Sequence, residues 1–149
     1  MYNDDRKKIK SDHILTGGNC ILDITQRDIA IYLTEVKEAI KNDRYKIERN
    51  YNRQDNIDLF LAYIIDEKKA KEILLSLTTI DFSEVLQNEH KGYEDELLYV
   101  FGKDVELLKR MGHGSKTISL YIKLNKLDNC YVIVVSFHEQ KYPIKYYFK

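Results

Sequence analysis

Two strand-like segments near the C-terminal end carry side chains suited to acid–base chemistry. In "SLYIKLNK" the alternation puts Tyr121, Lys123 and Asn125 on one face, which we expect to be the accessible one. "YVIVVSFHE" begins with apolar residues on both faces, as a central strand does, and becomes polar at Ser136 and His138. Such groups are suited to metal-free RNA cleavage: a base takes the 2′-hydroxyl proton, cations stabilise the phosphorane, and an acid protonates the leaving oxygen.

The spacing of these segments predicts how the two polar sets meet. If they form a hairpin whose turn is centred just after Leu127, Tyr121 faces Val134 and His138 faces Thr117. Tyr121 and His138 then share a face but lie ~13 Å apart along the strand. Direct contact therefore requires a bulge, a strong twist or a bridging substrate.

A purely structural interpretation of the same residues stays open. A lone histidine at a strand end is more often a hydrogen-bonded surface residue than a catalyst, and the 12 tyrosines suit half-buried strands. The closing "PIKYYFK" is interpreted as a last strand with Pro143 at its start, although its aromatic side chains can also stack nucleic-acid bases.

Other candidate motifs do not meet the requirements of their chemistry. "GHGSKT", residues 112–117, lacks the Gly-Lys-Ser/Thr order of a phosphate loop and is predicted to be a turn. The four histidines lack zinc-site spacing, and Cys20 and Cys130 suggest neither a metal site nor a disulfide framework. We therefore expect no metal and no cofactor.

Length and composition indicate one domain in the cytoplasm. The 149 residues carry a formal net charge of +0, so any affinity for nucleic acid must be local. Residues 103–149 hold nine basic against four acidic side chains, which suits either RNA or a lysine-protected sheet edge. The charged start has no apolar signal-peptide core and no apolar run approaches ~20 residues, so we expect no membrane association.

The first half of the chain predicts helices. In "TQRDIAIYLTEVKEAIKND" the apolar residues recur at helical spacing, and Thr25 with Asp28 suits a capping box. "DEKKAKEILLSL" predicts another helix capped by Asp66. "NRQDNIDLFLAYII" suits either a helix starting near Asp55 or Asn56 or a buried strand, and "RYKIERN" a short strand or an extended link.

The second half predicts strands. "DFSEVLQNEH", "DELLYVFGKDVELL", "KTISLYIKLNK" and "CYVIVVSFHEQ" have strand composition and are separated by turn-forming residues. Helices followed by strands predict an α+β fold with the helices on one face of a mostly antiparallel sheet. Residues 1–19 are predicted to be a flexible or loosely docked extension, and residues 20–149 a single domain.

The order of several of these segments resembles the MqsR family of type II toxin-antitoxin toxins. The series is "EVKEAIKNDRYKIER", "ILLSLTTIDF", "LYIKLN" and "YVIVVSFHE", over residues 29–139. The resemblance implies a RelE-like fold, ribosome-independent cleavage of single-stranded mRNA and a cognate antitoxin protein as partner. It also implies that Tyr121 matches the family's strand tyrosine, His138 the basic residue after "VSF", and Glu96 the family's glutamine.

One departure from the family's pattern leaves two functions open. Glu84 stands where the family has a lysine after "DF", and the neutral net charge is low for a ribonuclease. The cations expected to bind RNA phosphates are Lys103, Lys109, Arg110, Lys123 and Lys141. The leading hypothesis is an endoribonuclease with Tyr121, His138 and Glu96 as catalytic residues. The alternative is a non-catalytic protein of the same fold that binds a protein partner through its tyrosine-rich end.

Overall fold

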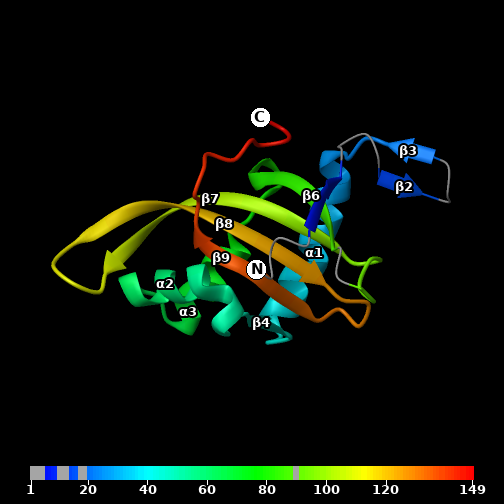
Figure 1. The fold of residues 1–149 in the computed structure, drawn as a ribbon. Helices are drawn as coiled ribbons and strands as arrows, with labels where there is room; N and C mark the ends of the chain where they lie inside the picture. Colours follow the sequence, from blue (N-terminus) through cyan, green and yellow to red (C-terminus); the bar gives the residue numbers. More distant parts are fainter. Residues whose placement is uncertain (1–5, 10–13, 17–19, 89–90) are drawn as a thin grey trace.

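The protein has an α+β fold with a curled mixed sheet and, in the part of the chain that the structure describes, three α-helices (Figure 1). The computed structural model describes residues 6–9, 14–16, 20–88 and 91–149, with side chains from residue 23 onward. The helices are α1 (Gln26–Lys41), α2 (Gln54–Ala62) and α3 (Glu67–Leu75), with 3-10 turns η2 (Tyr51–Arg53) and η3 (Thr79–Asp81). The strands are β1 (Arg6–Ile9), β2 (Ile14–Thr16), β3 (Cys20–Leu22), β4 (Tyr45–Ile47), β5 (Tyr63–Ile64), β6 (Phe82–Asn88), β7 (Leu97–Lys109), β8 (Ser115–Lys126) and β9 (Val132–Glu139).

The main sheet has the order β1-β6-β7-β8-β9-β4, and β5 pairs with the far end of β7. All of its strand pairs are antiparallel except β4 with β9, which is parallel. β2 and β3 form a separate antiparallel pair. The β7–β8 ribbon extends well beyond the other strands (Figure 1). The predicted α+β class and the mostly antiparallel pairing are confirmed.

Helix starts follow the capping signals in the sequence. The Thr25 hydroxyl accepts from the Asp28 N–H at 3.1 Å, and the Asp28 carboxylate accepts from the Thr25 N–H at 2.9 Å. The Asp66 carboxylate accepts from the Lys69 N–H at 2.8 Å at the start of α3. Each bond satisfies a backbone donor that the first helical turn leaves unpaired. The predicted caps of both helices are confirmed.

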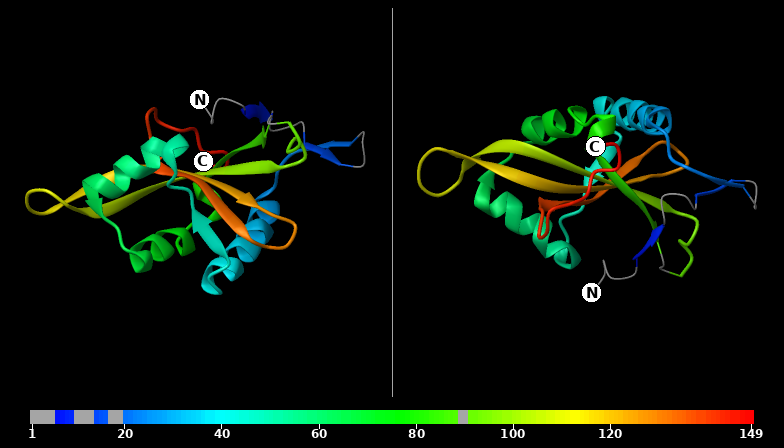
Figure 2. Two further views of the ribbon diagram at one scale, coloured as in Figure 1. Left: turned by 60° about the horizontal axis from the view of Figure 1, so that its bottom comes forward. Right: turned by 90° about the horizontal axis from the view of Figure 1, so that it is seen from above.

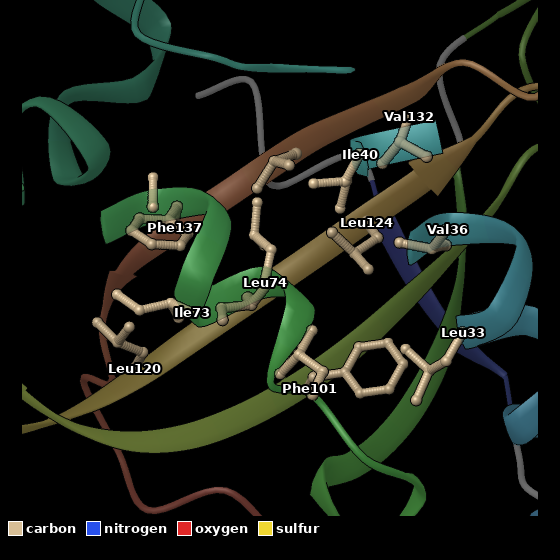
Figure 3. Packing of buried hydrophobic residues seen from close by; sticks show 14 of the residues in the cluster. Leu33, Val36, Ile40, Ile73, Leu74, Phe101, Leu120, Leu124, Val132 and Phe137 are labelled. Atoms are coloured by element: carbon tan, nitrogen blue, oxygen red, sulfur yellow. The ribbon is translucent and has the colours of Figure 1, made fainter. Parts of the chain in front are cut away.

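The main core lies between the sheet and the helices. Helices α1 and α3 cover one face of the sheet, and the C-terminal segment lies on the other side (Figure 2). Alternate side chains of β7, β8 and β9 point into the core because strand residues alternate between faces. Figure 3 shows part of this cluster, including Leu33, Val36, Ile40, Ile73, Leu74, Phe101, Leu120, Leu124, Val132 and Phe137. None of the described helices has the length and apolar character needed to cross a bilayer.

Both ends of the chain differ from the sequence-based expectation. Within the predicted extension, Arg6–Ile9 forms β1 and pairs with β6, so this part belongs to the sheet; residues 1–5, 10–13 and 17–19 lie outside the described residues. The predicted strand "PIKYYFK" is wrong, because residues 140–149 form no strand. The Tyr147 N–H instead donates to the Phe82 carbonyl at 2.9 Å, and Tyr147 and Phe148 pack against the Phe82 ring.

The predicted hairpin register between β8 and β9 is also wrong. A longer turn closes the hairpin: the Leu127 N–H donates to the Tyr131 carbonyl at 2.8 Å, and Cys130 has a positive φ of 63°. Leu124 pairs with Val134, and Tyr121 pairs with His138. Between these two pairs β9 has one residue more than β8, and this extra residue, Val135, forms a bulge. β9 therefore changes face at the bulge, and His138 lies opposite Tyr121 rather than Thr117.

Candidate functional site

The centre of the candidate site is the cross-strand pair Tyr121 and His138. Both lie on the face of the sheet opposite α1 and α3, which we call the outer face; it bears Tyr121, Lys123, Asn125, Ser136 and His138. The two rings stack with centroids 5.2 Å apart and planes 13° from parallel. Both side chains are half-buried, so each keeps an accessible part. Contact between the two predicted catalytic side chains therefore needs no bridging substrate.

His138 is held as a neutral imidazole with a defined tautomer. Its Nδ1 lies 2.9 Å from the Glu139 carbonyl oxygen, which accepts only, so Nδ1 carries the proton and Nε2 the lone pair. Burial lowers the pKa of His138, and the nearby Lys141 and Lys123 lower it further, against the raising effects of the Glu139 carbonyl and Asp55. The arrangement gives a base that is unprotonated near neutral pH.

Lys123 lies next to this pair but is more buried than the alternation predicts. Its Nζ lies 5.6 Å from the centre of the Tyr121 ring, within cation–π range. Lys123 is only 4% exposed and Asn125 7%, so the expectation that this face of β8 is the accessible one is wrong for these two residues. A second apolar cluster on the outer face accounts for the burial; it comprises Leu86, Leu98, Val100 and Val135, with Tyr121 and Ile133 packed against it.

The C-terminal segment forms one wall of the site. Gly102 of β7 pairs with Tyr121 of β8. A Cβ atom at Gly102 would lie 2.3 Å from Ile144 Cδ1 and 2.6 Å from the Tyr146 hydroxyl. The Gln140 amide holds this segment in place: it donates to the Leu120 carbonyl at 2.9 Å and accepts from the Ile144 N–H at 3.3 Å. The absence of a side chain at Gly102 thus lets the chain end lie against β7 at the residue that pairs with Tyr121.

The five predicted RNA-binding cations do not gather at one place. Lys123 and Lys141 are near His138, and the Lys141 Nζ lies 2.8 Å from an Asp55 carboxylate oxygen. Lys103 points to the helix side, where its Nζ lies 3.1 Å from Asp81 Oδ2. Lys109 and Arg110 are at the far end of the β7–β8 ribbon, and the Arg110 guanidinium donates to the carbonyls of Phe60 and Tyr63.

Glu96, the acidic residue predicted to be catalytic, lies away from the Tyr121–His138 pair. Glu96 Oε1 accepts from Asn125 Nδ2 at 3.0 Å, and Asn125 is four positions or ~13 Å along β8 from Tyr121. Glu96 lines a cavity of about 720 Å³ with other acidic residues; these are Asp28, Glu35, Asp95 and Asp128. Glu84 lies on β6 in the same cross-sheet row as Lys123, with Val100 between them. Glu96 therefore does not belong to the same site as Tyr121 and His138.

Sequence reasoning did not identify Asn56 as a site residue. It lies in α2, is 1% exposed, and contacts the backbone of β9 at the bulge through its carboxamide. The sequence gives no distinctive signal for it, because Asn56 closes a polar stretch near the start of the helix, where asparagine is an ordinary capping residue. Its role becomes visible only from its contacts with β9 in the folded structure.

The arrangement provides a base, a phenol and a nearby cation on one face of the sheet. Within residues 23–88 and 91–149, no group of three or more His, Cys, Asp or Glu side chains is placed to hold a metal ion. Comparison of the chain with family models, curated proteins and solved structures finds no match.

Proposed function

We propose that this protein is an endoribonuclease toxin of a type II toxin-antitoxin system, similar to the MqsR family, that cleaves single-stranded mRNA without a metal ion. The observation that carries the proposal is the Tyr121–His138 contact, with centroids 5.2 Å apart and Lys123 beside the phenol. The RelE-like fold and the cytoplasmic location belong to the same proposal. A cognate antitoxin protein would neutralise the toxin by covering the outer face.

In the proposed reaction His138 is the base and the Tyr121 phenol is the acid. His138 Nε2 takes the proton of a ribose 2′-hydroxyl, and the 2′-oxygen attacks the adjacent phosphorus. The bond from phosphorus to the 5′-oxygen breaks, and that oxygen takes the Tyr121 hydroxyl proton. The products are a 2′,3′-cyclic phosphate and a 5′-hydroxyl end. Proton transfer from His138 back to the Tyr121 oxygen through solvent restores both groups.

Two cations stabilise the negative charge in this scheme. Lys123 lies 5.6 Å from the Tyr121 ring centre, and its burial strengthens its electrostatic effect because water screens it poorly. Lys141 is 61% exposed and pairs with Asp55, so an RNA phosphate can replace the carboxylate as its partner. Glu84 occupies the lysine position of the family's pattern, so these two residues supply the positive charge instead.

A second candidate function is a non-catalytic protein that binds a protein partner. The observation that favours it is the C-terminal segment beside Gly102, with Tyr142 81% exposed and a net charge of zero over the chain. Exposed tyrosines are common in protein interfaces. This candidate predicts that Tyr142→Ala weakens partner binding, whereas His138→Ala does not.

The test is cleavage of a long single-stranded RNA by purified protein in EDTA. Wild type should cut at defined sites and leave 2′,3′-cyclic phosphate ends. Removal of a catalytic acid or base costs about 10²–10⁴-fold, so His138→Ala and Tyr121→Phe should be impaired to that extent. Lys109→Ala is the matched control, because Lys109 is exposed and lies at the far end of the ribbon.

Three results would count against the ribonuclease. Equal cutting by all four proteins indicates a contaminating nuclease, and no cutting by any of them favours the protein-binding function. Cutting that EDTA abolishes and Mg²⁺ restores indicates metal-dependent chemistry in place of the base and phenol.

A further inference from the structure

Asn56 uses its whole carboxamide to bind the backbone of other elements. Its Nδ2 donates to the Glu48 carbonyl at 2.7 Å and to the Val135 carbonyl at 3.1 Å, and its Oδ1 accepts from the Phe137 N–H at 2.9 Å. The side chain is 1% exposed, so water cannot replace these bonds. Loss of the amide would leave buried backbone groups of β9 without partners.

The amide acts where the neighbouring strand ends. β4 pairs with β9 as far as Ile47 opposite Val134, and the Glu48 N–H donates to the Val134 carbonyl at 3.0 Å. Beyond that point Asn56 takes the place of a strand, because it offers a donor and an acceptor to the same edge of β9. The two bonds to β9 flank Ser136, immediately after the bulge at Val135.

The bulge decides which face His138 occupies. With the pairing of Leu124 and Val134 continued without a bulge, Tyr121 would face Phe137, and His138 would face Leu120 in the main core. A one-residue slip moves every following side chain to the other face of the sheet. The extra residue Val135 therefore puts Phe137 in the core and His138 beside Tyr121.

We propose that Asn56 is a positioning residue, which holds the β9 bulge through Val135 and Phe137 and so holds His138 against Tyr121 on the outer face. Its importance for RNA cleavage rests on the proposed function, whereas its effect on the position of His138 does not. Asn56 itself does not contact the reacting atoms.

The test is NMR of the full chain, with Asn56→Ala, Asn56→Asp and the control Gln54→Ala. Gln54 is an exposed residue of α2 whose side chain bonds Asp58 within the same helix. Both Asn56 variants should lose the nuclear Overhauser effects between the Tyr121 and His138 rings and show a shifted His138 titration. The Phe137 amide should exchange about tenfold faster or more in Asn56→Ala. Gln54→Ala should match wild type.

Two results would overturn the proposal. One is a folded Asn56→Ala or Asn56→Asp with the ring contacts and the His138 titration of wild type. The other is global unfolding of both variants with Gln54→Ala intact, because Asn56 would then support the whole fold and not the position of one side chain.

Cleavage by the same variants separates the proposal from the proposed function. If wild type does not cut RNA, the ribonuclease function fails and the positioning result stands on the NMR data. If wild type cuts, Asn56→Asp should lower the turnover rate with RNA affinity kept. Loss of the ring contacts with unchanged turnover would overturn the role of Asn56 in the reaction.

Discussion

Tyr121 of β8 and His138 of β9 lie directly opposite each other, and their rings stack with centroids 5.2 Å apart. A hairpin with a tight turn would have set them ~13 Å apart. The longer turn and the bulge at Val135 remove this separation. Both features are irregularities of the backbone, one in the turn before β9 and one within β9. The contact between the two rings therefore depends on them.

The lowered pKa of His138 predicts how stability depends on pH. Burial is the main cause of the shift, with Lys141 and Lys123 adding to it, and Asp55 and the Glu139 carbonyl opposing it. The unfolded chain, with a His pKa of about 6.5, binds the proton more readily than the folded protein. The resulting stability is fully present above about pH 6.5 and is lost as pH falls through the folded-state pKa.

Urea unfolding of wild type and His138→Gln from pH 5 to 8 measures this effect. Wild type should lose unfolding free energy relative to His138→Gln as the pH falls below about 6.5, because only wild type carries this imidazole. A difference that is constant over this range would show that the pKa of His138 is the same in both states.

Much of the fold could be predicted because its signals are local. The Thr25 and Asp66 caps and the four long strands lie where the sequence predicts them. The turn after Lys126 could not, because Cys130 adopts a left-handed conformation that glycine, asparagine or aspartate would have signalled. The pairing of Arg6–Ile9 with β6 is a long-range contact without a local pattern.

The site could be predicted only in part. The expectation that Tyr121 and His138 share a face holds only because two deviations from the expected hairpin compensate. Alternation alone groups His138 with Val132 and Val134, which lie in the main core, and the bulge at Val135 moves His138 to the outer face. Their contact depends on Asn56, which lies 79 residues before Val135 and has no spacing relationship to it. The position of Lys103 in the basic C-terminal third suggests a phosphate ligand, and the sequence does not reveal that its side chain pairs with Asp81 on the helix side.

Gly102→Ala should detach the C-terminal segment from the outer face. The new Cβ would approach Ile144 Cδ1 to 2.3 Å and the Tyr146 hydroxyl to 2.6 Å, so both side chains must move. Overpacking of this kind costs about 1–3 kcal/mol. Limited trypsin digestion should then cut faster at Lys145, which lies in that segment. Gly102→Ala combined with Ile144→Ala and Tyr146→Phe, which removes both atoms that the new Cβ would meet, should recover protection, and failure to do so would place the constraint elsewhere.

Phe82→Ala should be among the most destabilising single changes. The Phe82 ring is fully buried and contacts the rings of Tyr99, Phe101, Tyr147 and Phe148. Truncation of a buried phenylalanine costs about 3–5 kcal/mol. Tyr142→Ala is the control, because Tyr142 is 81% exposed and should change stability by less than about 0.5 kcal/mol. Similar denaturation midpoints for the two variants would contradict the packing of the chain end on Phe82.

Lys141→Ala should reduce the salt dependence of RNA binding. Each phosphate contact with a single strand contributes about 0.7 to the slope of log affinity against log salt, because the contact releases a condensed counterion. Lys141 is near His138 and exposed, whereas the exposed Lys109 is at the far end of the ribbon. We therefore expect the slope to fall by about 0.7 in Lys141→Ala and to stay unchanged in Lys109→Ala.

Fluorescence anisotropy with a 2′-O-methyl RNA, which lacks the attacking hydroxyl, measures this slope between 50 and 200 mM salt without cleavage. His138→Ala serves as a second control, because a neutral imidazole releases no counterion and should leave the slope unchanged. Equal losses of slope in Lys141→Ala and Lys109→Ala would mean that RNA binds diffusely over the basic residues. A slope near zero in wild type would remove the phosphate contacts from the proposal and leave the protein-binding function as the better explanation of this face.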